Sequence, residues 1–250
     1  MASLNPNTTV LGVAFAKHLL RRATFKYTKV TIDQFSLLTP AQALDLLFQN
    51  EPLTVSLPYD PLPTGAADGF WTESTALPTT FTGQARKGAI VAGWWWYNAI
   101  NDATLKYKLS HFLSTRFTVE KGNSTGTSTD FYDYIRLLLF YSYGNYKTLA
   151  KKMTLCNSML LYLNNNENNA NSPNENYARE FLELFTIGKG EQIAPGNYTN
   201  YTEADIVQTA KVLTGFKRKS DRTIIDTTTG IPKGQNSFGQ NKLGQSKLGQ

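Results

Sequence analysis

The segment from Ser172 to Gly188 constrains the fold of this chain more than any other, because it has the pattern of one amphipathic helix. Ser172 is a favourable N-cap, and Pro173 suits the first helical position, where no amide hydrogen is needed. Glu175 lies where the acid of a capping box accepts from the N-cap amide, and Gly188 supplies a left-handed end. The pattern therefore predicts a helix between Ser172 and Gly188.

The polar face of this helix is built around a central arginine. Glu175, Arg179 and Glu183 follow at i, i+4 and i+8, so one guanidinium can bridge two carboxylates. At about 100° per residue, Asn176 and Glu180 fall on the same side. One interpretation is a solvated ladder of ion pairs, each worth about 0.2–0.5 kcal/mol.

A second interpretation makes the same face an acid–base site. Glu180 and Glu183 are three residues apart, and a like-charged neighbour raises the pKa of a carboxyl group. Under this hypothesis Glu180 or Glu183 is the general acid or base and Arg179 orients an anionic group. Asn176 and Glu175 are then candidate binding residues. Local spacing does not decide between the two interpretations.

Three polar residues near the N-terminus are further candidates for binding. His18 and Arg22 lie at i and i+4 of a helix predicted over residues 10–22, and Arg21 lies beside them. They either complete a polar site with the carboxylates of the second helix or form a solvated edge.

Composition excludes several classes of site. A chain of 250 residues with 41% hydrophobic content can bury a sizeable core. Cys156 is the only cysteine, so the chain has no internal disulfide and no cysteine cage for a metal. His18 and His111 are the only histidines, so the chain has few of the ligands that a catalytic zinc site needs. Phosphate-binding loops, nucleophile elbows and dinucleotide fingerprints are missing, so we expect neither a metal nor a cofactor.

The net charge of +6 is confined to the C-terminal part of the chain. From Lys211 onward there are eight basic and two acidic residues, and the first 210 residues are neutral overall. We therefore expect no basic face and no nucleic-acid partner, with the run 217–219 and Arg222 solvated. No segment reaches the ~18 apolar residues of a membrane span, and the N-terminus lacks the pattern of a cleavable signal peptide.

Helical periodicity dominates the rest of the chain and predicts a mainly α fold, an irregular multi-helix bundle with long connectors rich in Pro, Gly and Thr. Helices are predicted over 10–22, 40–49, 86–100, 104–117, 131–143, 146–153 and 203–214. Residues 1–216 are expected to form one helical domain, in which 51–83 is an extended connector on the surface. Residues 217–250, which close in four pentads ending in Gly-Gln, are a basic Gly/Gln-rich tail or a truncated edge of the domain.

Four consecutive aromatic residues, Trp94 to Tyr97, lie in the helix predicted over 86–100. On a helix they sweep about 300°, so they cannot all face one ligand. We expect most of them to pack in the core, and an exposed ring among them could stack on a sugar.

Several motifs in order resemble one bacterial family, catalogued as domain of unknown function 1800. They are His18–Phe25 (HLLRRATF), Gly144–Leu149 (GNYKTL), Ser158–Leu163 (SMLLYL), Asn174–Gly188 (NENYAREFLELFTIG), Tyr201–Ile206 (YTEADI) and Leu213–Phe216 (LTGF). The resemblance extends over about residues 11–216.

The resemblance implies a mostly helical bacterial protein whose activity is not assigned. Members tend to occur beside a family related to sulfatases and phosphatases, and many are exported, which favours an envelope-associated or extracellular location. Where the family has Trp-His-x-His-Phe, this chain has Leu113-Ser-Thr-Arg-Phe117, so it lacks that histidine pair. Lys26 replaces a family glycine, and the family domain is expected to continue past residue 230.

Two functional hypotheses follow. The first is a non-catalytic helical protein that binds a partner protein or a glycan in an envelope-associated assembly. The second is a metal-independent hydrolase of a cell-envelope polymer that uses Glu180 or Glu183 as general acid or base. The sequence does not decide whether the protein is an enzyme.

Overall fold

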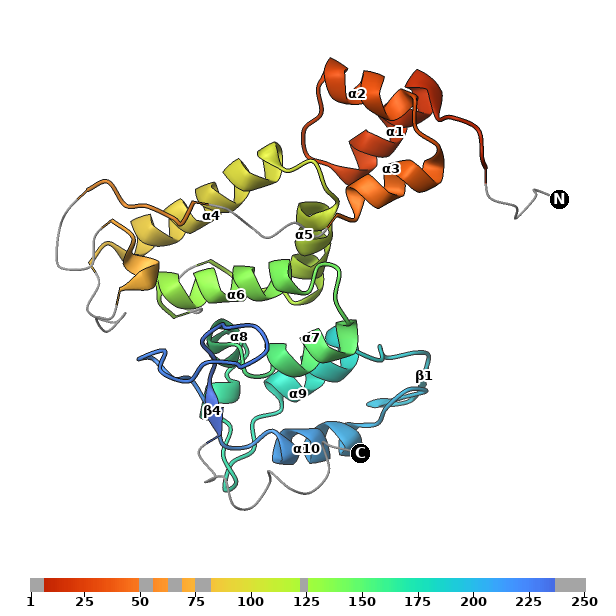
Figure 1. Cartoon of the computed structure of the whole chain (residues 1–250). Coiled ribbons are helices and arrows are strands. Elements are labelled where there is room, and N and C mark those ends of the chain that lie inside the picture. The colour runs from red at the N-terminus through yellow and green to blue at the C-terminus, as the bar shows by residue number, and fades with distance from the viewer. Residues whose placement is uncertain (1–6, 50–55, 63–68, 75–81, 122–125, 237–250) are drawn as a thin grey trace.

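The computed structural model describes residues 7–49, 56–62, 69–74, 82–121 and 126–236. These residues form helices joined by loops, together with two small antiparallel sheets of two strands each (Figure 1). The prediction of a mainly α fold is confirmed. None of the helices in the described ranges is long and apolar enough to cross a membrane.

The α-helices are α1 (Gly12–Ala23), α2 (Lys29–Ser36), α3 (Pro40–Leu47), α4 (Gln84–Asn101), α5 (Lys106–Arg116), α6 (Ser128–Phe140), α7 (Tyr146–Met153), α8 (Asn157–Tyr162), α9 (Asn176–Glu180) and α10 (Glu203–Val212). Short 3-10 turns are η1 (Trp71–Glu73) and η4 (Asn165–Glu167), and η5 (Phe181–Phe185) is a π-helical turn. Strand β1 (Gln192–Ala194) pairs with β2 (Asn197–Tyr198), and β3 (Phe216–Lys217) pairs with β4 (Gln235–Asn236).

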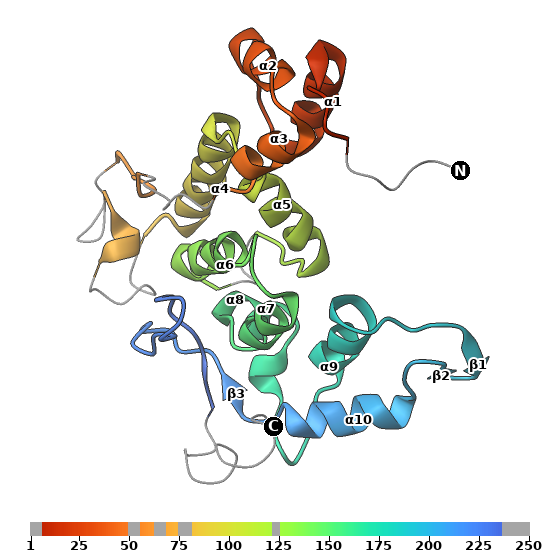
Figure 2. The same ribbon diagram turned by 45° about the vertical axis from the view of Figure 1, so that its right-hand side comes forward.

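Helices α1 to α3 form a separate packing unit at one end of the molecule, with its own small core (Figures 1 and 2). Thr39 caps α3 and Gln42 completes the capping box, so α3 begins at Pro40, where the helix predicted over 40–49 begins. Phe25 joins this unit to the rest of the protein through edge contacts with Trp95 and Trp96, whose ring centroids lie 5.6 and 5.4 Å away.

Helix α6 is the centre of the larger core. It packs against α4 and α5 on one side and against α7 and α8 on the other. Most of its side chains are buried, including Tyr134, Leu138 and Leu139. Asp130 and Asp133 are also buried, so this helix carries charge into the core.

The connector predicted over 51–83 is described only in part. Asp60 and Gly69 form an antiparallel bridge, and Trp71 is completely buried in the main core. The Trp71 indole donates to Ser128 Oγ at the start of α6 over 3.0 Å. This part of the connector therefore enters the interior instead of lying on the surface, because the large indole ring is buried there. Residues 51–55, 63–68 and 75–81 lie outside the described residues.

The start of the helix predicted from Ser172 is wrong. Ser172 forms a bridge with Asn169, and α9 begins only at Asn176. The Asn174 side chain accepts from the Asn176 amide over 3.0 Å, which is the role expected of Ser172. The Asn168 side chain accepts from the Asn174 amide over 2.9 Å and so holds the preceding residues in a loop.

The end of this segment agrees with the sequence, but its second half is not α-helical. Gly188 has φ +71° and its amide donates to Leu182 O, so it ends the segment as predicted. Opposite the polar face, Tyr177 and Phe185 are buried, whereas Leu184 is 56% exposed. The wider π-turn shifts the angular phase of the residues, which explains why Leu184 leaves the apolar face.

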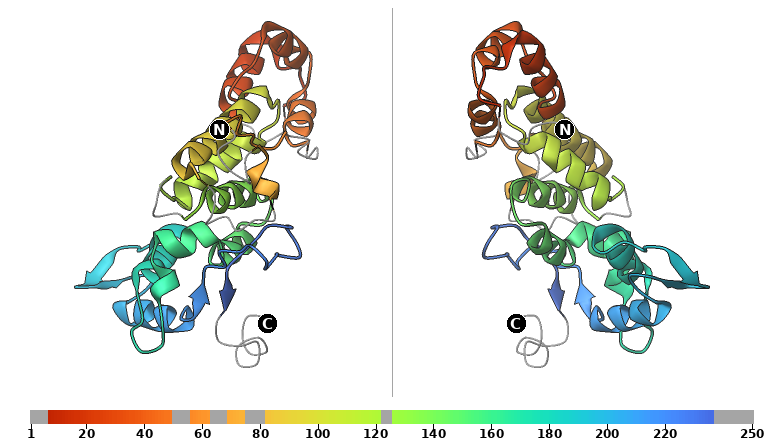
Figure 3. Two further views of the ribbon diagram at one scale, coloured as in Figure 1. Left: turned by 90° about the vertical axis from the view of Figure 1, so that its left-hand side faces the viewer. Right: turned by 90° about the vertical axis from the view of Figure 1, so that its right-hand side faces the viewer.

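Residues 217–236 contact α6, α7 and α8 through Asp130, Lys152 and Asn157 (Figure 3). The Gly234 amide donates to Leu155 O over 2.7 Å, and Ile231 is buried in the main core. The sequence left two alternatives for residues 217–250, a Gly/Gln-rich tail or an edge of the domain. The contacts and buried side chains of residues 217–236 are those of a domain edge. Residues 237–250, which hold most of the Gly-Gln pentads, lie outside the described residues.

The buried carboxylate of Asp60 should make the stability of the protein depend on acid pH. Burial alone would raise the pKa of Asp60, but hydrogen bonds from Arg86 and Lys87 outweigh this effect and hold the pKa at about 2. The ionised group therefore stabilises the fold above about pH 4. On the order of 2 kcal/mol of this stabilisation is lost as the pH falls towards 2.

Urea unfolding of Asp60→Asn across this pH range checks the expectation. The variant should be less stable than the parent at pH 7, and its stability should fall less between pH 4 and pH 2. Asp45→Asn, which changes an exposed carboxylate on α3, is the control. Equal acid sensitivity of Asp60→Asn and the parent would contradict the role of this ion pair.

Candidate functional site

Arg179 lies at the centre of the predicted polar site and pairs with two carboxylates. Its Nη1 and Nη2 donate to Oε1 and Oε2 of Glu203 over 2.7 and 2.8 Å, and Nη2 lies 3.4 Å from Glu175 Oε2. The expected pair with Glu175 forms, but the second carboxylate is Glu203 of α10 and not Glu183. Pairing with Arg179 lowers the pKa of Glu203, and the bidentate contact ties α9 to α10.

Glu183 is held by partners that come from the chain after η5. Lys189 Nζ lies 2.6 Å from Glu183 Oε1, and the Tyr201 hydroxyl donates to Oε2 over 3.2 Å. Lys189 also lies over the Tyr198 ring, 5.2 Å from its centroid. Glu183 thus anchors the β1–β2 hairpin and its flanks to the π-turn.

Glu180 differs from its neighbours, since no hydrogen bond or ion pair joins it to another side chain in the described ranges. Burial raises the pKa of Glu180, and the charge of Glu183 adds to the effect. Asn176 donates from Nδ2 to Leu163 O over 3.2 Å and so connects α9 to the end of α8. The predicted acid–base pair therefore consists of one carboxylate that is ion-paired and one that is not.

The N-terminal candidates lie in a different part of the molecule. His18, Arg21 and Arg22 are exposed on α1, in the unit formed by α1 to α3. Helix α9 lies near the opposite end (Figures 1 and 2). The structure brings together Glu175, Arg179 and their partners, but it does not bring the α1 residues to that face.

The four consecutive aromatics point in different directions, as the helical geometry required. Trp95 is buried, and Trp94 packs edge-on against Tyr132 with ring centroids 5.4 Å apart. Trp96 and Tyr97 are 50% and 63% exposed. Two rings of the run are therefore available at the surface.

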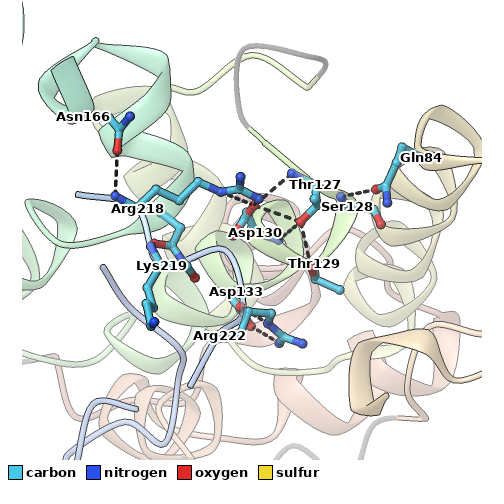
Figure 4. Close-up of polar contacts among 11 residues, drawn as sticks. Gln84, Thr127, Ser128, Thr129, Asp130, Asp133, Asn166, Arg218, Lys219 and Arg222 are labelled. Carbon is cyan, nitrogen blue, oxygen red and sulfur yellow. Dashed lines mark hydrogen bonds and ion pairs between the residues drawn. The ribbon is translucent and has the colours of Figure 1, made fainter. Parts of the chain in front are cut away.

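A second polar cluster, which sequence reasoning missed, joins α6 to the C-terminal segment (Figure 4). Arg218 Nη2 and Nε donate to Asp130 Oδ2 over 2.6 and 3.1 Å. Arg222 contacts both oxygens of Asp133 over 2.9 Å, and its Nη1 donates to Thr72 O over 3.0 Å. The expectation that these arginines are solvated is wrong, because each neutralises a buried carboxylate.

Side-chain amides complete this cluster. The Asn166 side chain accepts from the Arg218 amide over 2.8 Å, and Asn157 Oδ1 accepts from the Lys219 amide over 3.1 Å. Burial raises the pKa of Asp133 to about 6, although Arg222 acts in the opposite direction. Arg222 also has φ +56°, a left-handed conformation that is unusual for a non-glycine residue. The segment is thus fixed by side-chain contacts and not by regular structure.

The signal for this cluster was weak in the sequence. Arg218 and Arg222 are four residues apart, but their acids lie 88 and 89 residues earlier in the chain. No spacing rule connects positions that distant. Within the described ranges, no group of three or more His, Cys, Asp or Glu side chains could hold a metal ion.

Comparison with known proteins gives one match. A family model described as "Protein of unknown function (DUF1800)" matches residues 18–246. The match includes both the α9 segment and the C-terminal segment with Arg218 and Arg222. No curated protein and no solved structure matches the chain.

The Arg179–Glu203 pair should contribute modestly to stability. Both side chains are partly exposed, at 36% and 42%, so a double-mutant cycle with Arg179→Met and Glu203→Gln should give a coupling energy of about 0.5–1 kcal/mol. The control cycle uses Lys29 and Asp33, whose pair is more exposed, and should give a smaller value. Urea unfolding provides both measurements, and a zero coupling for Arg179–Glu203 would contradict its role in joining the helices.

Removal of Arg222 should be more damaging, because Asp133 would stay buried without its partner. We expect Arg222→Met to lower the free energy of unfolding at pH 7 by about 3–5 kcal/mol. Burial raises the pKa of Asp133, so this carboxyl group is protonated and neutral at low pH. The destabilisation by an unpaired buried charge is therefore absent at low pH, and it grows as the pH rises through the raised pKa. The loss should therefore be smaller at pH 5 than at pH 7.

Two further variants control this experiment. Asp133→Asn combined with Arg222→Met should recover part of the stability, because position 133 then carries no unpaired buried charge. Lys219→Met removes a partly exposed pair with Asp221 in the same segment and should have little effect. A loss in Arg222→Met that is the same at both pH values would contradict this account.

Proposed function

The chain belongs to the DUF1800 family of proteins of unknown function, and we propose that it is a non-catalytic helical component of an envelope-associated assembly that binds a partner protein or a glycan. The observation that carries the proposal is the pairing of the polar face of α9. Arg179 is committed to Glu203 and Glu183 to Lys189, so these groups hold α10 and the β1–β2 hairpin in place. Side chains that are ion-paired in this way stabilise the fold and are less available to bind a substrate.

Exposed aromatic and aliphatic side chains supply surfaces for binding. Trp96 and Tyr97 are exposed on α4, and the α1–α3 unit exposes Phe15, Val30 and Leu37 at 67%, 76% and 74%. An exposed indole offers a flat apolar face of the kind on which sugar rings stack. The envelope location rests on the resemblance to the family alone.

Two observations favour the alternative, a metal-independent hydrolase of a cell-envelope polymer. Burial and the charge of Glu183 raise the pKa of Glu180, which is the direction required of a general acid near neutral pH. The π-turn that follows Glu180 supports the same view, since such turns are frequent at functional sites. In this alternative Glu180 is the acid, and Arg179, already paired, has a supporting role.

A screen of the purified protein against envelope glycans, read out by intrinsic fluorescence and by mass spectrometry of released products, tests both proposals. We expect binding without turnover, and Trp96→Ala should weaken it roughly threefold to tenfold, because the exposed ring is lost. Phe15→Ala removes a ring of α1 that is 67% exposed, against 50% for Trp96, and should leave glycan binding unchanged.

The outcomes separate the two functions. Released products that disappear in Glu180→Gln would establish the hydrolase and overturn the non-catalytic proposal. If Phe15→Ala weakens glycan binding and Trp96→Ala does not, the binding surface lies on the α1–α3 unit and not at Trp96.

A further inference from the structure

A small cavity lies between α6, α7 and the C-terminal segment, away from the polar face of α9 and the exposed indole of Trp96. Its volume is about 20 Å³, which is room for one water-sized group. The buried side chains of Leu137, Cys156 and Ile231 give it apolar walls. Lys152 and Lys233 line it as well, and their side chains are 25% and 32% exposed. The cavity thus has apolar side chains on its walls and two cations at its rim, and two buried carboxylates, Asp133 and Asp226, line it as well.

The rim is held in place by a single carboxylate, Asp226. Its Oδ1 accepts from the amides of Thr228 and Thr229 over 3.2 and 3.0 Å. Its Oδ2 accepts from Lys152 and lies 3.8 Å from Lys233 Nζ. An ammonium group has three donors, and each lysine uses one carboxylate here, so both can donate to a further acceptor at the rim.

The balance of charge around the cavity is positive. Asp133 also lines the cavity, but Arg222 pairs with both of its oxygens, and Arg136 lies 4.0 Å from it. Asp226 is shared by two lysines. Two lysines and two carboxylates line the cavity, and Arg222 and Arg136, which do not line it, add two positive charges next to Asp133. The surroundings of this partly buried site are therefore positive, which favours an anion.

We propose that this cavity binds a small organic carboxylate. The carboxylate group would accept hydrogen bonds from Lys152 and Lys233 at the rim, and one methyl-sized group would occupy the apolar interior. The apolar walls favour such a ligand over an inorganic oxyanion, which would place polar oxygens against Leu137 and Ile231 without partners. This site is independent of the proposed binding of a glycan or a protein.

Acetate is the probe that tests the proposal, on the full chain. Amide chemical shifts of Thr229 and Ile231 are followed by NMR as sodium acetate is added, with sodium chloride and trimethylacetate titrated separately at the same ionic strength. Acetate should give saturable shifts at these residues. Trimethylacetate carries the same charge but is too bulky for about 20 Å³, so it should not.

Two lysine variants complete the test. Lys233→Met should weaken acetate binding about tenfold, because one charge-assisted hydrogen bond is lost. Lys219→Met is the matched control, since Lys219 is 29% exposed, pairs with Asp221 in the same segment and does not line the cavity. It should leave the affinity unchanged.

Several results would overturn the proposal. Shifts that do not saturate, or equal weakening by both lysine variants, would mean that acetate responds only to overall charge. Equal binding of trimethylacetate would place the ligand outside the cavity. The same saturable shifts with chloride would show a general anion site and not a carboxylate site.

Discussion

Two carboxylates buried on the central helix α6 are the constraint on which the rest of the structure depends. Asp130 and Asp133 are 0% and 2% exposed, and a buried charge is costly unless it is paired and hydrogen-bonded. Arg218 and Arg222 supply the partners from a segment with little regular structure of its own. The main core and the C-terminal segment are therefore interdependent.

This pairing also joins parts of the chain that lie far apart in the sequence. Arg222 reaches the carbonyl of Thr72 in η1, while the Arg218 amide is bound by Asn166 of η4. One short segment thus connects α6 with an earlier element, η1, and a later one, η4. Figure 4 shows its contacts with α6 and with Asn166. The cavity lined by Lys152 and Lys233 lies between this segment and helices α6 and α7, which together supply its walls.

The elements at the two ends of the molecule are joined to the rest by other contacts than the buried ion pairs of α6. The α1–α3 unit has its own core and meets the remainder through Phe25 and a few further contacts. At the other end, α9 and α10 are joined by the Arg179–Glu203 pair. Charged groups in the centre and at the α9 face hold elements together, whereas Trp96 and Tyr97 of α4 are exposed at the surface.

Much of the fold could be predicted because helix formation depends on neighbours in the chain. The apolar period and the caps at Thr39 and Thr202 were sufficient to place α3 and α10, since each capping box closes within three residues. Local rules failed at Ser172, where Asn168 and Asn169 bind the backbone in a loop that competes with the helix. They also failed to anticipate α2, whose β-branched residues give a weak helical signal.

The sequence by itself determined the mainly α class, the exclusion of cysteine-based sites and the amphipathic face of α9, because composition and periodicity are local properties. Only the tertiary structure decided which charges meet. Arg179 took Glu203 in place of Glu183, and Arg218 and Arg222 became partners of buried acids instead of a solvated run. The physical reason is that an ion pair depends on distance in space and on burial, and neither can be read from separation along the chain.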